Sequence, residues 1–216
     1  MKAMIVLLLA ISYGLVGCVS ISTLQDAETT KKGEMSHTVA IGNIGGEVDV
    51  DGASGLPGDL ADEISVPMID YMFRYGFHES MDFGLRISGS SYGADWKWNF
   101  INGEFGLASG LGIGISEYEI ESGSTKEKYS LQDLVIPVYT HYNFNETLRG
   151  YLVPKFVIRS VNTNATGVEN TSNNLLGATI GLKINKWFVE YTTLTGESEE
   201  SEEDISVSQF AAGYTF

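Results

Sequence analysis

The sequence predicts an all-β fold: a closed antiparallel up-and-down transmembrane β-barrel, with ten strands as the simplest count and eight as the alternative. Three observations lead to this prediction. Apolar residues recur at every second position along much of the chain, the breaks between these runs alternate between short and long, and charged residues lie on the face opposite the aromatic one. An apolar outside with a charged inside is the polarity that surrounding lipid demands.

The first residues, "MKAMIVLLLAISYGLVGC", predict a secretory signal peptide, because one early lysine precedes an apolar stretch too short to span a membrane. The end of this stretch, Leu15-Val16-Gly17-Cys18, resembles a bacterial lipobox. The resemblance implies that residues 1–17 are removed and that Cys18 carries acyl chains such as palmitate. An ordinary signal peptide with a chance cysteine is the alternative. Because Cys18 is the only cysteine, a disulfide framework and a thiolate metal site are excluded.

Residues 18–33, "CVSISTLQDAETTKKG", are polar and show no apolar period, which predicts a lipidated flexible tether. Val19 is not the aspartate that resembles an inner-membrane retention signal in enteric bacteria, and this likeness implies transport to the outer membrane. Residues 34–216 remain for the barrel, which we expect to be one domain.

Ten runs of alternating polarity form the predicted strands, with tight breaks at "FHES", "NG", "FNETL" and "NK" and an intermediate one at "SSYGA". The runs lie near residues 35–45, 64–76, 81–89, 95–101, 104–117, 130–144, 149–160, 174–184, 187–194 and 205–216. The long polar breaks are 46–63, 118–129, 161–173 and 195–204. Short turns at one end and long loops at the other are typical of transmembrane barrels. An even strand number then places both ends of the barrel on the short-turn side, which we expect to be periplasmic.

Charges in the middle of strands define the predicted inner face. In "MDFGLRISG", Phe83, Leu85 and Ile87 alternate with Asp82 and Arg86, and "DYMFRYGF" and "LVPKFVIRS" repeat the pattern. We expect these inward charges to form a polar network that makes the barrel rigid, and to act structurally rather than in catalysis. The predicted members are Asp70, Arg74, Arg86, His141, Lys155, Arg159 and Glu190.

Glycines fill one face of the run "EFGLASGLGIGIS", at Gly106, Gly110, Gly112 and Gly114. A phosphate-binding loop is not indicated, because no Gly-Lys-Ser/Thr sequence and no switch from strand to helix follows. We expect this strand to leave space inside the barrel for long side chains from the opposite wall.

The last residues, "SVSQFAAGYTF", alternate up to the final position, with Phe210, Tyr214 and Phe216 on the apolar face. This ending resembles the barrel-assembly signal of small outer-membrane β-barrel proteins of Gram-negative bacteria, and the wider likeness covers roughly residues 34–216. The resemblance implies an outer-membrane location, with outer-membrane lipids and the barrel-assembly machinery as partners. It also implies lipid anchoring at Cys18 with both termini on the periplasmic side.

Aromatic residues near the strand ends predict two girdles, one at each membrane interface. Those near the short turns are Tyr75, Phe77, Phe100, Phe105, Tyr142, Phe144, Trp187 and Phe216. Those near the long loops are Tyr92, Trp96, Tyr118 and Tyr129. Packing of the same residues in a protein core is the alternative explanation.

The net charge of −15 argues against a nucleic-acid partner, whose phosphates would be repelled. The acidic residues gather in the predicted long loops, for example in "ESEESEED". These loops are expected to attract divalent cations weakly, because they lack the spacing of a calcium loop. No cofactor and no defined metal site is predicted.

Barrel enzymes of this size provide a test for catalysis. Omptin-like proteases carry an Asp-x-His pair at the outer rim, and no such pair occurs here. His78-Glu79-Ser80 has the His-x-Ser spacing of phospholipase-like sites but falls in a predicted periplasmic turn. The sequence therefore predicts a non-catalytic barrel with a structural or surface-interaction role, in adhesion or binding. A narrow porin-like channel and a lipocalin-like lipoprotein carrying a small apolar ligand are the alternatives.

Overall fold

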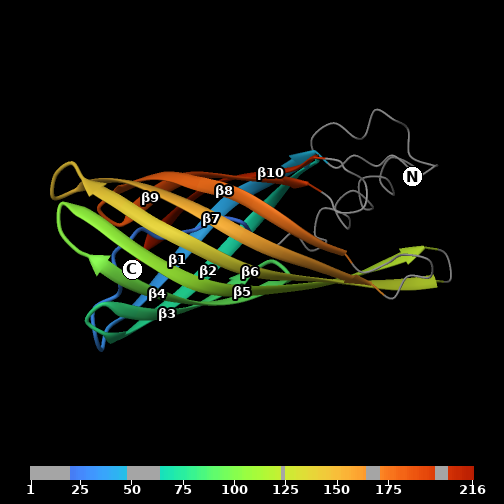
Figure 1. Cartoon of the computed structure of the whole chain (residues 1–216), viewed down its shortest axis with the longest axis horizontal. Coiled ribbons are helices and arrows are strands. Elements are labelled where there is room, and N and C mark those ends of the chain that lie inside the picture. Colours follow the sequence, from blue (N-terminus) through green and yellow to red (C-terminus); the bar gives the residue numbers. More distant parts are fainter. Residues whose placement is uncertain (1–19, 48–63, 123–124, 164–170, 198–203) are drawn as a thin grey trace, which may run out of the picture.

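The computed structural model describes residues 20–47, 64–122, 125–163, 171–197 and 204–216. These residues form a closed barrel of ten antiparallel strands, in which each strand pairs with its neighbours in the chain and the first pairs with the last (Figure 1). The prediction of a ten-stranded up-and-down barrel is confirmed. The strands are β1 Met35–Glu47, β2 Ile64–His78, β3 Met81–Ser88, β4 Ser91–Ile101, β5 Phe105–Ser122, β6 Thr125–Asn143, β7 Leu148–Thr163, β8 Thr171–Ile184, β9 Trp187–Glu197 and β10 Asp204–Thr215.

The strands are longer at one end of the barrel than the sequence predicted. β5 and β6 stay paired up to Ser122 and Thr125, so the predicted polar loop at 118–129 is wrong and a hairpin projects beyond the other strands (Figure 1). The register sets Glu119 opposite Lys128, and opposed residues of opposite charge favour pairing. This end is called the loop end below, and the opposite end, with the turns before β3, β5, β7 and β9, is the short-turn end.

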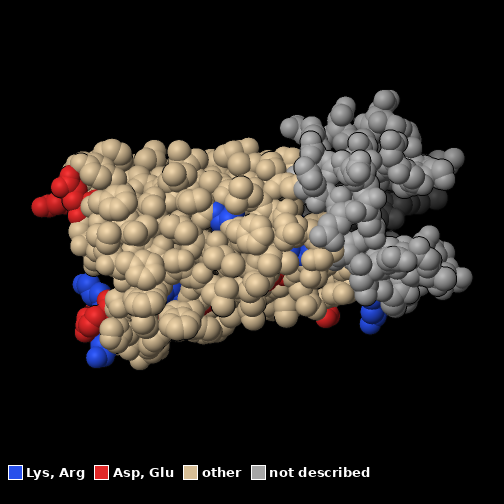
Figure 2. Space-filling model, in the orientation of Figure 1, with Lys and Arg blue, Asp and Glu red and all other residues tan. Residues whose placement is uncertain are grey.

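The outer wall of the barrel is apolar. Ile69, Leu176 and Ile180 are each more than 60% exposed, whereas Asp82 and Lys97 on the inner face are at most 1% exposed. Figure 2 shows one face of the barrel, on which few charged residues appear along the strands, whereas acidic and basic residues gather at the short-turn end. Such a wall is stable next to lipid and not next to water, which identifies the barrel as a transmembrane one.

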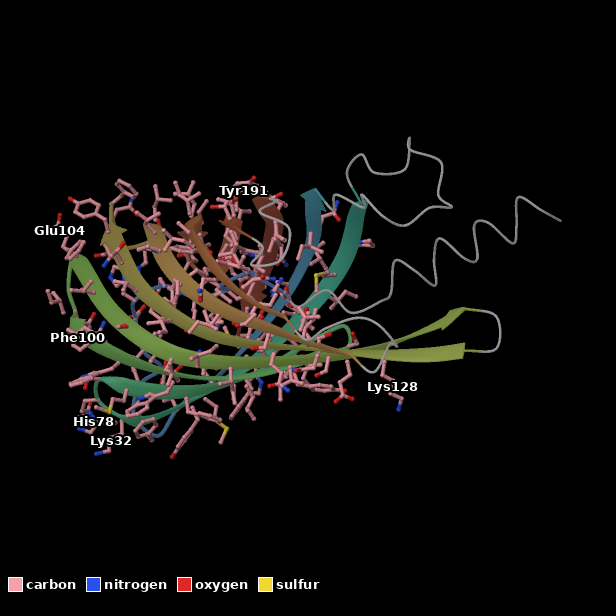
Figure 3. The ribbon with its side chains drawn as sticks, turned by 45° about the vertical axis from the view of Figure 1, so that its right-hand side comes forward. Lys32, His78, Phe100, Glu104, Lys128 and Tyr191 are labelled. Carbon is pink, nitrogen blue, oxygen red and sulfur yellow. The ribbon has the colours of Figure 1, made fainter. Side chains whose placement is uncertain are left out.

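Exposed aromatic side chains mark the short-turn end, as the girdle hypothesis expects. Figure 3 shows Phe100 at this end together with Glu104, His78 and Lys32, while Lys128 lies at the opposite end. The eight aromatic residues predicted there are between 38% and 64% exposed. At the loop end, Tyr92 is also exposed. The predicted place of Trp96 in that girdle is wrong, because Trp96 pairs with Phe83 near the start of β3 and its ring centroid lies 6.4 Å from that of Phe77, on the short-turn side. The side chains of the other two predicted members of that girdle lie outside the described residues.

The chain before β1 does not behave as the flexible tether that the sequence predicted for residues 18–33. Within its described part, residues 20–24, 26 and 27 are buried inside the barrel. We call residues 20–33 the lumen segment. The prediction failed because a polar stretch was assigned to water, whereas the inner wall of this barrel supplies its hydrogen-bond partners. The described residues include no long apolar helix of the membrane-crossing kind.

Candidate functional site: the occupied lumen

The lumen segment runs from the short-turn end towards the middle of the barrel. At the short-turn end, the Gly33 backbone N–H donates to the carbonyl of Gly76 over 2.7 Å. At its other end, the Ser20 hydroxyl donates to Asp70 over 3.0 Å and accepts from the amide of Gln209 over 3.1 Å. Asp70 lies near the middle of β2 and Gln209 near the middle of β10. The segment therefore fills roughly the half of the lumen nearest the short turns.

Two inward side chains accept hydrogen bonds from the backbone N–H groups of residues 21–24. Gln209 Oε1 accepts from the first two of these groups, over 2.8 and 3.0 Å. The Glu190 carboxylate accepts from the next two, over 2.7 and 3.0 Å, and also from the hydroxyl groups of Ser22 and of Tyr151. Both side chains are at most 2% exposed. In water, solvent molecules would accept hydrogen bonds from these backbone N–H groups. Inside the barrel, the two wall side chains take the place of that solvent.

Two cations donate to the carbonyl groups of the same stretch. Lys155 Nζ lies 2.7 Å from the carbonyl oxygen of Ile21 and 2.7 Å from the hydroxyl of Thr23. The Arg86 guanidinium donates to the carbonyl groups of Ser20 and Thr23 over 3.3 and 3.1 Å. Backbone donors and acceptors in this part of the lumen segment thus both find partners on the wall.

The lumen segment changes direction at Leu24. Its backbone φ of 58° is in the left-handed region, which costs about 1–2 kcal/mol for a residue other than glycine. The side chain of Leu24 is buried against Met72, Phe188 and Ala211. This packing, with the hydrogen bond from the Leu24 N–H to Glu190, offsets the unfavourable backbone conformation.

Asp26 is the centre of charge in the second half of the lumen segment. Its carboxylate lies 2.8 Å from Arg149 and 3.2 Å from Lys183, while Lys97 donates to its backbone carbonyl over 3.1 Å. Burial alone would raise the pKa of Asp26, but Lys183, Arg149 and Lys97 outweigh it and hold that pKa well below its ordinary value. Glu28, which is more exposed, also pairs with Arg149.

The remaining inner charges pair within the wall. Arg74 binds both Asp82 and Asp95, and Arg159 holds Asp133 through two hydrogen bonds of 2.7 and 2.8 Å. These pairs cross from one strand to another, so they tie the wall together as well as neutralising it.

Six of the seven predicted network residues take part in these contacts. Asp70, Arg86, Lys155 and Glu190 contact the lumen segment itself, a role that the sequence analysis did not foresee. Arg74 and Arg159 pair with carboxylates of the wall.

The seventh predicted member, His141, is buried beside Gly106 of the neighbouring strand, where a Cβ atom would lie 2.2 Å from the His141 ring. Its ring nitrogens hydrogen-bond no other side chain in the described part of the chain. The glycine thus makes room for a long side chain of the inner wall, as predicted for this strand, although that side chain comes from the adjacent strand.

The predicted polar network left out Gln209, Asn99 and Asp26, and it also left out Lys97, whose inward position the alternation does predict. All of them except Asp26 have inward positions in the alternation of their strands, and Asn99 donates to the carbonyl of Ala27 over 2.6 Å. One signal in the sequence could have indicated them. The number of long polar side chains at inward positions is larger than the number of partners that the opposite wall offers.

A cavity of about 100 Å³ remains between the lumen segment and the wall formed by β3 to β7. Gly93, Gly112 and Gly114 leave this space, and Arg86 and Lys155 border it. The cavity could hold a few water molecules.

The C-terminal strand closes the barrel. Phe216 and His37 exchange two backbone hydrogen bonds, of 2.8 and 3.0 Å, and their rings stack. Tyr214 packs edge-on against Trp187, with ring centroids 4.9 Å apart, and Phe210 is half exposed on the outer wall. Of the three aromatic residues predicted as an assembly signal, Phe210 and Tyr214 thus belong to β10 and Phe216 follows it directly, with Phe210 and Phe216 exposed.

Other predicted features give no catalytic or metal arrangement among the described residues. The His78 ring and the Ser80 hydroxyl lie 3.2 Å apart in an exposed turn at the short-turn end. No group of three possible metal ligands occurs in the described ranges. The signal peptide, Cys18 and most of the acidic loop residues lie outside them.

Comparison with known proteins gives similarity at the level of the barrel. No protein-family model and no curated protein matches the chain. Among solved structures, the outer membrane protease OmpT from Escherichia coli is 9% identical, with a TM-score of 0.49, and the match covers 91% of this chain and all of that one. Ail, the attachment invasion locus protein of Yersinia pestis, is 13% identical, with a TM-score of 0.43 and coverage of 86% and 99%. The N-terminal β-barrel domain of Pseudomonas aeruginosa OprF is 10% identical, with a TM-score of 0.33 and coverage of 83% and 97%.

Proposed function

We propose that this chain is an outer-membrane β-barrel with a non-catalytic, structural or surface-interaction role. The observation that carries the proposal is the combination of an apolar outer wall with a lumen already filled by the protein's own residues. A barrel whose inside is occupied leaves its ends as the surfaces for contact with other molecules. The β5–β6 hairpin, which projects beyond the other strands at the loop end, is the clearest such surface (Figure 1).

The filled lumen argues against the two alternative functions in their simple forms. An open channel needs a continuous aqueous path, and the lumen segment occupies the half of the barrel nearest the short turns. A lipocalin-like carrier needs an apolar cup, whereas the inner wall here is rich in charged side chains such as Asp82 and Lys97.

Outer-membrane lipids are the proposed partners of the exposed wall, and the barrel-assembly machinery the proposed partner of Phe210, Tyr214 and Phe216. Divalent cations at the acidic loops remain a further proposal, expected to be weak. The short turns are proposed to face the periplasm, and both the C-terminus and the exit of the lumen segment are at that end.

Acylation of Cys18 restricts where Ser20 can lie, because the two residues are close in the chain. Two extended residues span at most about 7 Å, which is the longest reach that the covalent chain allows between Ser20 and an acylated Cys18. Ser20 is buried at the level of Asp70, six residues or about 20 Å of strand from the start of β2. Acyl chains need lipid, so we propose that the acylated chain has withdrawn Ser20 from the lumen. The intact mass of membrane-purified protein tells which form is present.

Membrane fractionation followed by electrophoresis of a Cys18→Ala chain, with and without boiling, tests the transmembrane barrel directly. We expect the protein to require detergent and to migrate faster before boiling than after it, because a folded barrel stays compact in the gel. A soluble protein with no heat-dependent shift would falsify the proposal. Deleting residues 119–128 is the matched test of the surface role, and it should leave the heat-dependent shift intact.

A further inference from the structure

The charges of the inner wall and of the lumen segment match in number. Among side chains that the structure describes, the wall carries seven basic and five acidic inward residues. The basic residues are Arg74, Arg86, Lys97, Arg149, Lys155, Arg159 and Lys183, and the acidic ones are Asp70, Asp82, Asp95, Asp133 and Glu190. Residues 20–28 of the lumen segment add two carboxylates, the buried Asp26 and the more exposed Glu28, and no cation. With the segment in place, the lumen is neutral.

The excess positive charge of the wall is concentrated where these two carboxylates lie. Arg149 of β7 and Lys183 of β8 are paired neighbours that both contact the Asp26 carboxylate, and Lys97 of β4, which also lies 3.9 Å from Asp82, donates to the Asp26 carbonyl. Arg149 and Lys183 form ion pairs with residues of the lumen segment, whereas the ion pairs of Arg74 and Arg159 lie within the wall. Without the segment, Arg149 and Lys183 would therefore lose their ion-pair partners, and the lumen beside them would carry an excess of positive charge.

The lumen segment is held mainly by polar contacts that can break and form again. Apart from Leu24, Ile21 and Ala27, which pack in small apolar clusters, it is held by hydrogen bonds and ion pairs that water and salt can replace. The segment joins the barrel covalently at the short-turn end only, through Glu34 into β1.

We propose that the lumen segment is a charge-matched plug, and that its displacement opens a pore that selects anions. Rings of Arg and Lys side chains favour anions in narrow pores. The selectivity comes from Lys97, Arg149 and Lys183, and the closed state from Asp26, Glu28 and the backbone contacts of residues 20–24. This inference rests on the proposed membrane insertion and goes beyond the proposed surface role.

Planar-bilayer recording tests the proposal with three proteins that all carry Cys18→Ala, so that acylation cannot withdraw Ser20. They are the full chain, a chain lacking residues 20–29, and the same deletion with Arg149→Gln and Lys183→Gln. In a KCl gradient, the chain that lacks residues 20–29 should conduct at least about tenfold more than the full chain. Its reversal potential should be displaced towards the equilibrium potential of chloride. The two glutamine substitutions should keep the conductance and remove the chloride preference. A folded deletion variant that does not conduct, that prefers potassium, or that conducts no more than the full chain overturns the proposal.

Folding of each variant is verified first by the heat-dependent shift in electrophoresis, which separates failure of the barrel from failure of the plug. If the deletion does not fold, Glu190→Gln combined with Gln209→Ala loosens the same segment in a chain of full length. That variant should show brief chloride-selective openings, and its silence in a folded barrel counts against the plug.

Discussion

The two halves of the lumen segment are held in different ways. Residues 20–24 are bound through their backbone, by side chains such as Gln209 and Glu190 that accept from consecutive N–H groups. Residues 26–28 are bound through two carboxylates that meet cations of the wall. The first half therefore depends mainly on contacts of its backbone, to which the hydroxyl groups of Ser22 and Thr23 add, whereas the second half depends more on the charge of single residues.

Asp26→Asn gives the largest expected effect, because it leaves Arg149 and Lys183 without their buried partner. Breaking a buried ion pair from one side costs about 3–5 kcal/mol, and the partial exposure of both cations favours the lower end. Urea unfolding of the barrel in detergent, followed by the heat-dependent shift, measures the change. Glu104→Gln at an exposed turn is the control, and an equal loss in both variants would contradict the special role of Asp26.

The second-largest effect is expected for the pH dependence of the stabilisation that Asp26 provides. Because its pKa is lowered on folding, the stabilisation is complete above the ordinary value of 3.8 and is lost as the pH falls towards the lower folded value. The difference in unfolding free energy between the unmodified chain and Asp26→Asn should therefore be constant near neutral pH and shrink below pH 3.8. A difference that grows on acidification would show that Asp26 is not the group involved.

Glu190→Gln should cost less, about 2 kcal/mol, although Glu190 makes more hydrogen bonds than any other side chain named in the lumen. The glutamine oxygen keeps part of the acceptor function, and Gln209 and Lys155 still hold the neighbouring backbone. The same unfolding assay provides the value. A loss larger than that of Asp26→Asn would reverse the comparison between the two halves.

Glu28→Gln is expected to have the smallest effect, below about 1 kcal/mol, because the Glu28 side chain is 44% exposed and solvent screens its pair with Arg149. The informative measurement is its salt dependence. The effect should disappear in 1 M salt, whereas that of Asp26→Asn should persist. Loss of both effects in salt would mean that water reaches Asp26 as readily as Glu28.

The barrel itself could be predicted from the sequence because its signal is local. Alternation with a period of two identified all ten strands and the inner positions of Arg74, Lys155 and Glu190. Strand ends were less predictable at the loop end, where Glu119 and Lys128 look like loop residues until their pairing across the hairpin is known.

The lumen segment could not be predicted, because nothing in residues 20–33 distinguishes a polar peptide in water from one in a polar lumen. Its partners are far away in the chain: Ile21 and Gln209 are separated by 188 positions. Only the closed barrel brings Arg149, Lys183 and Lys97 around Asp26. The alternation predicts inward positions for these three cations, but no residue outside the strands was considered as their partner.

Closure of the barrel by β1 and β10 has a consequence for the order of assembly. A sheet that closes encloses whatever lies on its concave side at that moment, and the lumen segment precedes β1 directly in the chain. Ser20 needs both Asp70 of β2 and Gln209 of β10, which lie on opposite sides of the seam formed with β1. Its contacts are complete only when β1 has paired with β10. Filling of the lumen and closure of the barrel therefore form one cooperative step, in which Ser20 reaches its final position late although it precedes every strand in the chain.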